Sequence, residues 1–256
     1  MDKVKNYKSV DIVIRMEIKM KIGIMQPYFL PYIGYFSLIE YSDRFIFFDT
    51  PQYIHHGWVN RNRVLKHDGT PNYISVPLEK AARETAINNM VIRDEDWVEK
   101  IFAQLVCYKK KAPYYKRTIE FLHSLLDVDY ERSLSKLNIE TTKAICEYIG
   151  LNRSFDTFSE MNLDIGQVNE PDEWALNITK AVGGDIYVNP PGGLSFFNKE
   201  KYQNEGIELQ FLKHNLTPYV QRIGRFEPGL SIIDVLMFNE EKDVTKMLAD
   251  YEIIIP

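Results

Sequence analysis

The sequence predicts an α/β protein with a parallel-sheet βαβ core and an inserted helical subdomain. A short apolar strand at residues 22–25 is followed by a loop with two prolines, a helix over 32–42 and a second buried strand over 44–48. This order is typical of parallel strands joined by a crossover helix. Residues 95–149 instead carry apolar side chains at helical spacing, and the last third of the chain returns to α/β alternation.

The middle of the chain shows the change of pattern most clearly. Residues 50–70 are polar and aromatic and end in a turn signal, so we expect a long loop there, followed by a strand over 73–78. Trp97, Ile101 and Leu105 then begin a series with helical spacing that continues to residue 149. We expect three helices in this stretch.

In the last third, residues 174–182 predict a helix that ends at Gly183, because glycine favours the position after a helix. Strands are expected over 185–188 and 208–212. Ser231 is a good N-cap for a short apolar helix over 232–238, with Asp234 in its first turn.

The composition narrows the classes of function. The chain has 256 residues, 31 Lys and Arg against 36 Asp and Glu, and a net charge of -5. This balance argues against strong nucleic-acid binding, although a local basic patch could hold one phosphorylated small molecule. The two cysteines form no CxxC pair, which argues against a zinc site and fits a reducing, cytoplasmic location. We also expect no membrane insertion and no signal peptide. The composition is compatible with a homodimer and does not decide the oligomeric state.

The first candidate site is the loop over residues 26–31, which follows the first strand. Ligands of parallel sheets bind beyond the carboxyl ends of strands, and a helix beginning near Tyr32 would offer free N–H groups to a phosphate. The layout resembles the opening of the nucleotidylyltransferase superfamily, where an HxGH signature holds the transferring phosphate. Tyr32 and Tyr35 stand where that signature has histidines, and they could equally pack the helix onto the sheet.

We therefore predict four parts of the chain. They are an N-terminal arm (1–19), a βαβ nucleotide-binding half (20–94), the helical subdomain (95–150) and a second α/β part that completes the core (151–256).

A second candidate site follows the strand that ends at Asp49. A carboxylate is costly to bury without a partner, so Asp49 could orient an imidazole. His55 and His56 are adjacent and would point apart on an extended chain, so only one of them is expected to act as a general base. The lack of a third ligand argues against a metal site.

Asn60, Arg61 and Arg63 concentrate hydrogen-bond donors in the same region. Residues two apart on an extended segment point the same way, so the two guanidinium groups would suit a diphosphate. A solvated polar loop is the alternative.

The helical segment supplies further candidates. Tyr108 and Tyr114 flank three lysines and Pro113, and each tyrosine could stack on a ring or bind a sugar hydroxyl. The lysines are more typical of a solvated helix end. Asn138 lies among apolar residues and could hydrogen-bond either a ligand or the protein.

Taken together, these residues resemble the WbqC-like protein family over about residues 20–240. The most specific part is the opening QPYxxPYxGYF with the later NRNR. The resemblance is carried by Gln26-Pro27-Tyr28, Pro31, Gly34-Tyr35-Phe36, Asp43, Asp49, Gln52-Tyr53, Asn60-Arg61-Asn62-Arg63, Val76-Pro77, Tyr108, Ala112-Pro113-Tyr114, Leu137-Asn138, Tyr187, Gly206-Ile207, Pro218-Tyr219, Phe226 and Leu230-Ser231-Ile232-Ile233-Asp234.

The resemblance implies a context in bacterial O-antigen and surface-polysaccharide biosynthesis. The resemblance alone does not supply the reaction. In this context, our leading hypothesis is an enzyme that joins an acyl or aminoacyl group, such as glycine, to the amine of a dTDP- or UDP-linked amino sugar. The acyl donor could be a CoA thioester, an aminoacyl-tRNA, or ATP plus an amino acid. A divergent nucleotidylyltransferase and a non-catalytic nucleotide-sugar binding protein remain the alternatives.

The predicted site follows from these observations together. His55 or His56 would be the base, with Asp49 and Asn60 as its catalytic partners. The expected substrate-binding residues are Gln26, Tyr28, Tyr35, Gln52, Arg61, Arg63, Tyr108, Tyr114, Asn138 and Tyr219.

Overall fold

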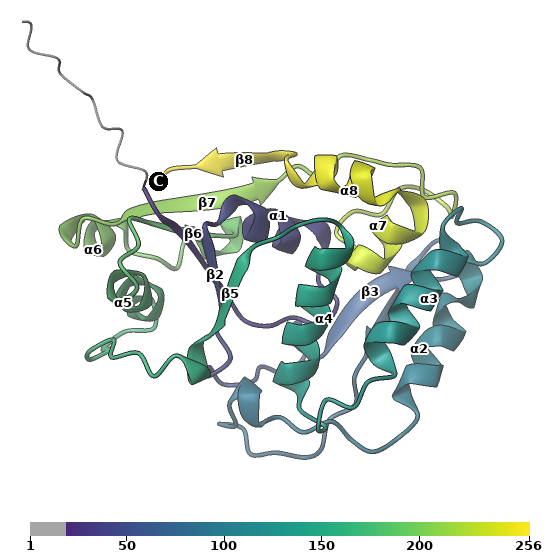
Figure 1. Ribbon diagram of the computed structural model, residues 1–256, viewed down its shortest axis with the longest axis horizontal. Helices are drawn as coiled ribbons and strands as arrows, with labels where there is room; N and C mark the ends of the chain where they lie inside the picture. Colours follow the sequence, from purple (N-terminus) through teal and green to yellow (C-terminus); the bar gives the residue numbers. More distant parts are fainter. Residues whose placement is uncertain (1–18) are drawn as a thin grey trace, which may run out of the picture.

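A computed structural model describes residues 19–256, in which a six-stranded sheet carries helices on both faces (Figure 1). The predicted arm over residues 1–19 lies outside the described residues, apart from Lys19. The order in the sheet is β5-β2-β1-β6-β7-β8, and β3 and β4 form a separate two-stranded sheet. The strands are β1 (Lys21–Met25), β2 (Arg44–Phe47), β3 (Arg61–Leu65), β4 (Pro71–Ser75), β5 (Ser154–Thr157), β6 (Ile186–Asn189), β7 (Glu208–His214) and β8 (Tyr251–Ile254).

The predicted α/β class is confirmed. β1 pairs in parallel with β2 on one side, with Ile24 opposite Ile46, and with β6 on the other, with Ile22 opposite Tyr187. Only β8, at one edge of the sheet, runs antiparallel to its neighbour β7. The strand order therefore reverses between β1 and β6, near the centre of the sheet.

The helices divide between the two faces of the sheet. One face packs against α5 and α6, while α1 and α8 lie on the other, together with the helices of the middle segment (Figure 1). The helices are α1 (Ile33–Tyr41), α2 (Trp97–Leu105), α3 (Tyr115–Leu126), α4 (Leu134–Tyr148), α5 (Glu173–Ala181), α6 (Lys199–Asn204), α7 (Ile232–Phe238) and α8 (Glu241–Leu248).

The three helices expected in residues 95–149 are present as α2, α3 and α4. Leu105 and Leu122 belong to the same continuous apolar cluster as Phe45 and Val188 of the sheet. The middle segment thus shares its hydrophobic core with one face of the sheet.

Gly23 of β1 packs closely against the segment that leads from α1 into β2, and only glycine fits at this position. A Cβ atom at this position would come within 2.4 Å of the Ser42 hydroxyl oxygen and 2.9 Å of the Phe45 ring. Glycine leaves the space that these neighbours fill, so β1 and β2 can pair directly below α1.

The expected long loop over residues 50–70 is wrong in its second half. Residues 61–65 form β3, which pairs antiparallel with β4 so that Arg63 lies opposite Tyr73. The alternation of buried and exposed residues along β3 is not visible in the sequence, because the buried position between the two arginines holds a polar residue, Asn62. β4 also begins and ends earlier than the strand predicted over 73–78.

Four short elements were not predicted at all, namely β5, α6, α8 and β8. Each is shorter than nine residues, so its pattern carries little periodic signal. The predicted cap at Ser231 is confirmed, since its hydroxyl accepts a hydrogen bond from the Ile233 N–H at 3.3 Å.

A buried carboxylate fixes α7 against the β3–β4 hairpin. Asp234 is fully buried and accepts hydrogen bonds from the Tyr108 hydroxyl at 2.7 Å, the Gln221 amide at 2.9 Å and the Tyr219 hydroxyl. The Tyr108 hydroxyl in turn accepts from the Leu65 N–H at 2.8 Å. Burial raises the pKa of Asp234, and its three donors act in the opposite direction.

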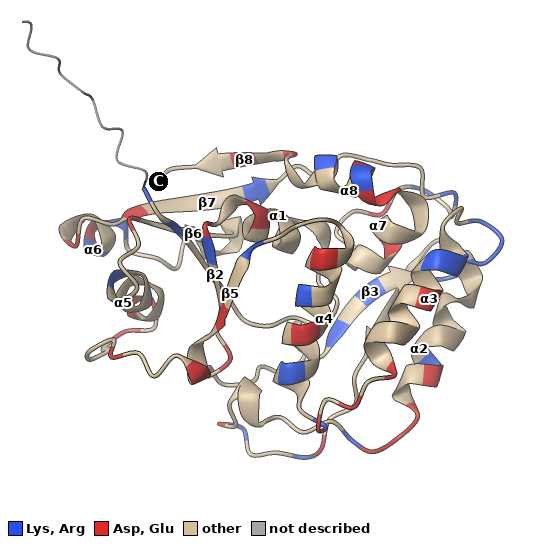
Figure 2. Cartoon of the chain, viewed as in Figure 1, with Lys and Arg blue, Asp and Glu red and all other residues tan. Residues whose placement is uncertain are grey.

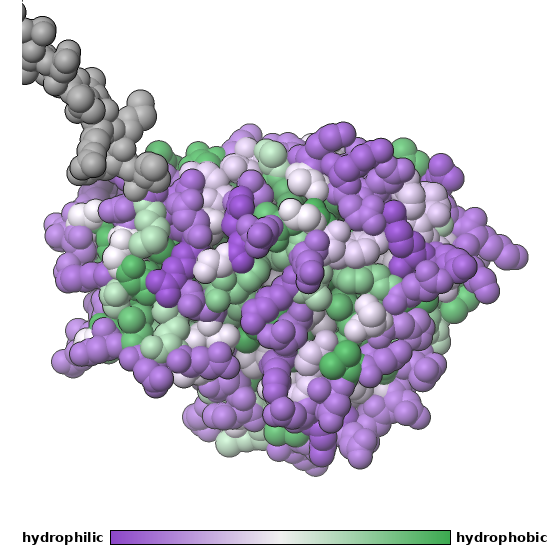
Figure 3. Space-filling view, in the orientation of Figure 1, coloured by the Kyte–Doolittle hydropathy of each residue, from purple (hydrophilic) through white to green (hydrophobic). Residues whose placement is uncertain are grey.

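Hydrophilic residues cover most of the face shown in Figure 3. No helix in residues 19–256 has the length and apolar character needed to cross a bilayer.

The environment of His214 predicts an acid-sensitive fold. Its Nε2 lies 3.0 Å from the Met247 carbonyl, while Nδ1 accepts the Leu216 N–H at 2.9 Å, so the neutral ring fits the site. Burial lowers the pKa of His214. The unfolded chain therefore binds this proton more readily than the folded one, and stability falls as the pH drops below ~6.5.

We expect His214→Gln to lose less stability than the wild type between pH 7 and pH 5, as measured by urea unfolding. His67→Gln, in an exposed turn, is the matched control and should keep the wild-type pH dependence. Equal slopes in His214→Gln and the wild type would contradict this assignment.

Candidate functional site

The main cavity lies beyond the carboxyl ends of β1, β2 and β6, where the strand order reverses. It has a volume of about 920 Å³, and Met25, Phe48 and Asn189 line it at the three strand ends. Open α/β sheets bind ligands at this kind of position. Among residues 19–256, none of those that line it is Lys, Arg, His, Asp or Glu, so these walls carry no charge at neutral pH.

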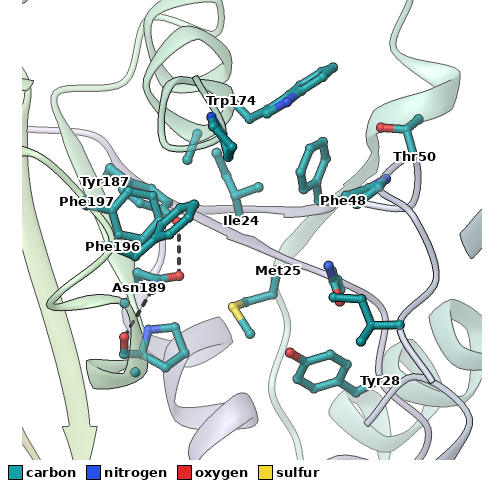
Figure 4. Close-up of a pocket in the computed structure, with 18 of the residues that line it drawn as sticks. Ile24, Met25, Tyr28, Phe48, Thr50, Trp174, Tyr187, Asn189, Phe196 and Phe197 are labelled. Atoms are coloured by element: carbon teal, nitrogen blue, oxygen red, sulfur yellow. Dashed lines mark hydrogen bonds between the residues drawn. The ribbon is translucent and has the colours of Figure 1, made fainter. Parts of the chain in front are cut away.

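One wall of the cavity is aromatic (Figure 4). Phe48 and Trp174 lie with ring centroids 5.5 Å apart, and Tyr187 and Phe197 with centroids 5.3 Å apart. Phe196 is 53% exposed, and it packs against Phe197 edge to face. These rings come from the residue after β2, from α5, from β6 and from the segment after β6, so the wall forms only in the folded chain.

The other wall is polar and comes from two loops. Gln26 and Tyr28 follow β1, and Thr50 and Gln52 follow β2. The Thr50 hydroxyl is buried without a hydrogen-bond partner in residues 19–256, and burial raises the pKa of Tyr28. Figure 4 shows the Tyr28 ring and Thr50 on the side of the cavity opposite Tyr187 and Phe197. This wall can donate and accept hydrogen bonds.

Asn189 fixes the turn that borders the aromatic wall. Its Oδ1 accepts from the Tyr187 hydroxyl at 3.0 Å, and its Nδ2 donates to the Pro190 carbonyl at 3.0 Å (Figure 4). A Cβ on Gly193 would come within 2.2 Å of that Nδ2, so glycine is needed for the close approach.

The loop that supplies Gln26 and Tyr28 is held by polar side chains from distant parts of the chain. Asn138 of α4 donates to the Pro27 carbonyl at 2.9 Å and to the Val59 carbonyl at 2.6 Å. Asn62 of β3 donates to the carbonyls of Phe29 and Leu30 at 3.1 and 2.9 Å. The Ser231 hydroxyl also donates to the Leu30 carbonyl, at 2.7 Å.

The N-terminus of α1, where the sequence predicts either a phosphate site or helix packing, is covered by protein, since Ile33 is 4% exposed and the next two residues are buried. The Ile232 N–H donates to the Pro31 carbonyl at 2.8 Å, and Tyr32 pairs with Ser231, so the chain before α7 covers this helix end. Tyr35 is 1% exposed and its hydroxyl donates to the Gln26 carbonyl at 2.9 Å. Tyr35 therefore supports the cavity wall without lining the cavity.

The predicted catalytic residues form no hydrogen bonds with one another within residues 19–256. Asp49 is buried and accepts hydrogen bonds from the Ser159 N–H and hydroxyl at 3.1 and 2.6 Å, not from an imidazole as predicted. His55 and His56 are exposed in a turn, with ring centroids 6.5 Å apart. The residue before them, Ile54, lines the cavity, which places the two histidines in the segment at its rim.

The donors predicted to bind a diphosphate are occupied by protein groups. Asn60 accepts from the Tyr53 hydroxyl at 2.9 Å and donates to the Val76 carbonyl at 3.0 Å. Arg61 and Arg63 do share one face of β3, as expected. Arg61 donates to two backbone carbonyls of the turn at 56–57.

Arg63 is tied to the segment before α7. Its Nη1 lies 3.3 Å from the Glu227 carboxylate, and its Nη2 donates to the carbonyls of Pro228 and Gly229 at 3.4 Å.

The remaining predicted binding residues also contact protein. Tyr108 and Tyr219 each donate a hydrogen bond to the buried Asp234 carboxylate. The Tyr114 hydroxyl donates to Glu240 at 3.1 Å, and Asn138 holds the loop after β1. Of the predicted binding residues, only Gln26, Tyr28 and Gln52 line the main cavity.

An acidic cluster near the start of α5 is bridged by a single lysine. The carboxylates of Glu170, Asp172 and Glu173 lie close together, and the Lys201 ammonium forms ion pairs with all three. This group joins α6 to α5.

The sequence did not identify the aromatic wall. Phe48, Trp174 and Phe196 have the apolar character of core residues, and their shared cavity depends on tertiary contacts. Their positions after strands could have identified them as cavity residues. Phe48 follows β2, and Phe196 follows the strand and turn at 186–193.

Two comparisons with known proteins returned matches. The sequence model of the WbqC-like protein family matches residues 26–246. The chain is also similar to "Uncharacterized protein Rv1507c" of Mycobacterium tuberculosis (strain ATCC 25618 / H37Rv), with 28% identity over 221 residues. That alignment covers 86% of this chain and 93% of the relative. No solved structure matches the chain.

Removing the amide that holds the loop after β1 should destabilise the protein. Asn138→Ala removes two hydrogen bonds and leaves two buried carbonyls unpaired, so we expect a loss of about 2–4 kcal/mol in urea unfolding. Asn152→Ala, at an exposed position, is the control and should change stability by less than about 0.5 kcal/mol. If both variants unfold at the wild-type midpoint, Asn138 does not hold this loop.

Proposed function

The chain belongs to the WbqC-like protein family, and from this premise we propose that it is an enzyme acting on a nucleotide-linked amino sugar. The proposed reaction transfers an acyl or aminoacyl group to the sugar amine, in the biosynthesis of O-antigen or another surface polysaccharide. The proposed site for the sugar is the cavity beyond β1, β2 and β6.

The observation that carries this proposal is the division of the cavity into an aromatic and a polar wall. A sugar ring has apolar C–H faces and hydroxyl edges. Trp174 and Phe48 could pack against such a face. Gln26, Gln52 and the Thr50 hydroxyl, which has no partner within residues 19–256, could hydrogen-bond the edges. The uncharged walls suit the sugar better than the diphosphate.

In the proposed reaction, the sugar nitrogen attacks the acyl carbonyl carbon, and a C–N bond forms as the bond from the acyl carbon to its carrier breaks. A nearby base takes the proton from the nitrogen, and the carrier leaves as a thiol or hydroxyl after gaining a proton. His55 and His56 are the candidates for the base, since both are exposed in the segment at the cavity rim.

The nucleotidylyltransferase alternative has less support. Such a reaction needs groups that stabilise a triphosphate, and the helix end expected to do so is covered by the segment before α7. A non-catalytic sugar-nucleotide binding protein would share the same cavity, so turnover distinguishes it from the proposed enzyme.

Sugar binding should depend on the aromatic wall. We expect Trp174→Ala to weaken binding of a UDP- or dTDP-linked amino sugar about tenfold, or about 1.4 kcal/mol, by isothermal titration calorimetry. Trp174→Phe should retain part of the affinity. Trp58→Ala removes an equally exposed indole outside the cavity and is the control; unchanged affinity in Trp174→Ala would refute the proposed sugar site.

Only one of the two histidines should matter for turnover. We expect one of His55→Ala and His56→Ala to lower turnover about 10²–10⁴-fold, the usual effect of losing a general base, with sugar-nucleotide binding intact. The assay follows N-acylation of the amino sugar with acyl-CoA or aminoacyl-tRNA, and His67→Ala is the control. Full turnover in both variants would place the base elsewhere.

A further inference from the structure

The exposed face of the β3–β4 hairpin carries aromatic and cationic side chains that the cavity does not use. Trp58 and Tyr73 are 40% and 45% exposed, and their rings lie 6.4 Å apart with an angle of 30° between them. The guanidinium carbon of Arg61 lies 4.3 Å from the Tyr73 ring centre, and that of Arg63 lies 5.9 Å from the Trp58 ring centre. We call these four residues the aromatic platform.

Cations without carboxylate partners gather next to this platform. The hairpin turn at 66–70 contacts two other loops: the Lys111 ammonium reaches the His67 carbonyl at 3.4 Å, and Gly69 lies against Gly224. Within residues 19–256, no salt bridge joins the cations of these three segments to a carboxylate, and we call them the basic tip. They are Lys66, Lys109, Lys110, Lys111, Arg222 and Arg225. The hairpin turn also holds one carboxylate, Asp68, whose pKa is lowered by hydrogen bonds from Thr70 and by Lys66, so the three segments carry six cations and one anion.

This concentration of positive charge contrasts with the rest of the chain. Elsewhere most described lysines and arginines have carboxylate partners, as Arg44 has Asp156 and Arg153 has Glu40. Figure 2 shows the blue positions on β3 and on the loop between α2 and α3. In a chain of net charge -5, such a patch favours binding of a phosphate-bearing ligand at this end of the molecule.

We propose that the aromatic platform and the basic tip bind the phosphorylated nucleoside of the acyl donor. A base can stack on Trp58 or Tyr73, and phosphates can reach the lysines and arginines of the tip. The rings lie beside the guanidinium groups of the strand, an arrangement that suits a planar base better than insertion into a membrane. This assignment rests on the proposed acyl transfer.

The position of the platform relative to the cavity supports a donor role. Ile54 lines the cavity, the turn at 55–57 follows it, and Trp58 begins the platform. Arg61 also ties the platform to this turn through the carbonyls of His56 and Gly57. A donor held by its nucleoside could therefore extend its acyl group past the two histidines toward the cavity.

Direct binding of donor fragments tests the proposal without any sugar. The probes are CoA, adenosine 3′,5′-bisphosphate and a tRNA with and without its terminal CCA. We expect at least one of them to bind, with affinity that falls as salt rises. Binding of CoA and the bisphosphate identifies a CoA thioester as the donor, whereas binding of tRNA only with its CCA end identifies an aminoacyl-tRNA.

Variants then locate the site. Trp58→Ala and Lys110→Glu should each weaken binding of that probe about tenfold or more, with the fold verified by circular dichroism. Lys199→Glu reverses an exposed cation on α6 and should stay within twofold of the wild type.

Three results overturn the proposal. The first is that no probe binds, and the second is that all variants bind the probe equally. The third is that Trp58→Ala weakens binding of the UDP- or dTDP-sugar, or of anionic vesicles, and leaves binding of the donor probes unchanged. The sugar site is tested separately by Trp174→Ala. Donor binding that survives a failed sugar experiment would leave the nucleoside site standing and reject the proposed acceptor.

Discussion

The structure depends on satisfying the backbone of a buried, proline-containing loop. Pro27, Phe29 and Leu30 follow the central strand β1, where their carbonyls cannot reach water or join a ladder. Asn138, Asn62 and Ser231 supply the missing donors from α4, β3 and the cap of α7. One short loop thereby fixes the positions of three elements that are far apart in the sequence. The same loop presents Gln26 and Tyr28 to the cavity, so the polar wall is positioned by groups that do not touch it.

The buried Asp234 carboxylate is likewise satisfied by hydrogen-bond donors from distant parts of the chain. Its carboxylate has no cationic partner within the described residues, and two tyrosine hydroxyls and one amide replace the water that it loses on burial. Tyr108 also accepts the Leu65 N–H, so the helix α7, the loop after α2 and the hairpin meet at one carboxylate. Residues that looked like sugar-binding tyrosines in the sequence are in this way part of the framework.

Elements whose apolar residues repeat at regular spacing could be predicted from the sequence. Features that depend on contacts between distant segments could not. The parallel βαβ unit and the helices α2 to α4 were evident because their apolar residues repeat at regular spacing. β3 was missed because Asn62 takes an inward position that usually holds an apolar side chain. In the candidate site, Gln26, Tyr28 and Gln52 follow strands in a way that the sequence shows. Asn60 and Asn138 have the same polar character, yet their hydrogen bonds go to protein groups, and only the fold distinguishes the two cases.

The pairing of β1 with β6 has a consequence for how the protein is made. These central neighbours are about 165 residues apart, as Lys21 and Ile186 illustrate, and every connection between them must be synthesised before they can pair. Contacts of such large sequence separation slow folding, and a ribosome-bound chain would expose the apolar edge of β1 until β6 emerges. The main cavity, which residues of both strands line, is therefore among the last features to form during synthesis.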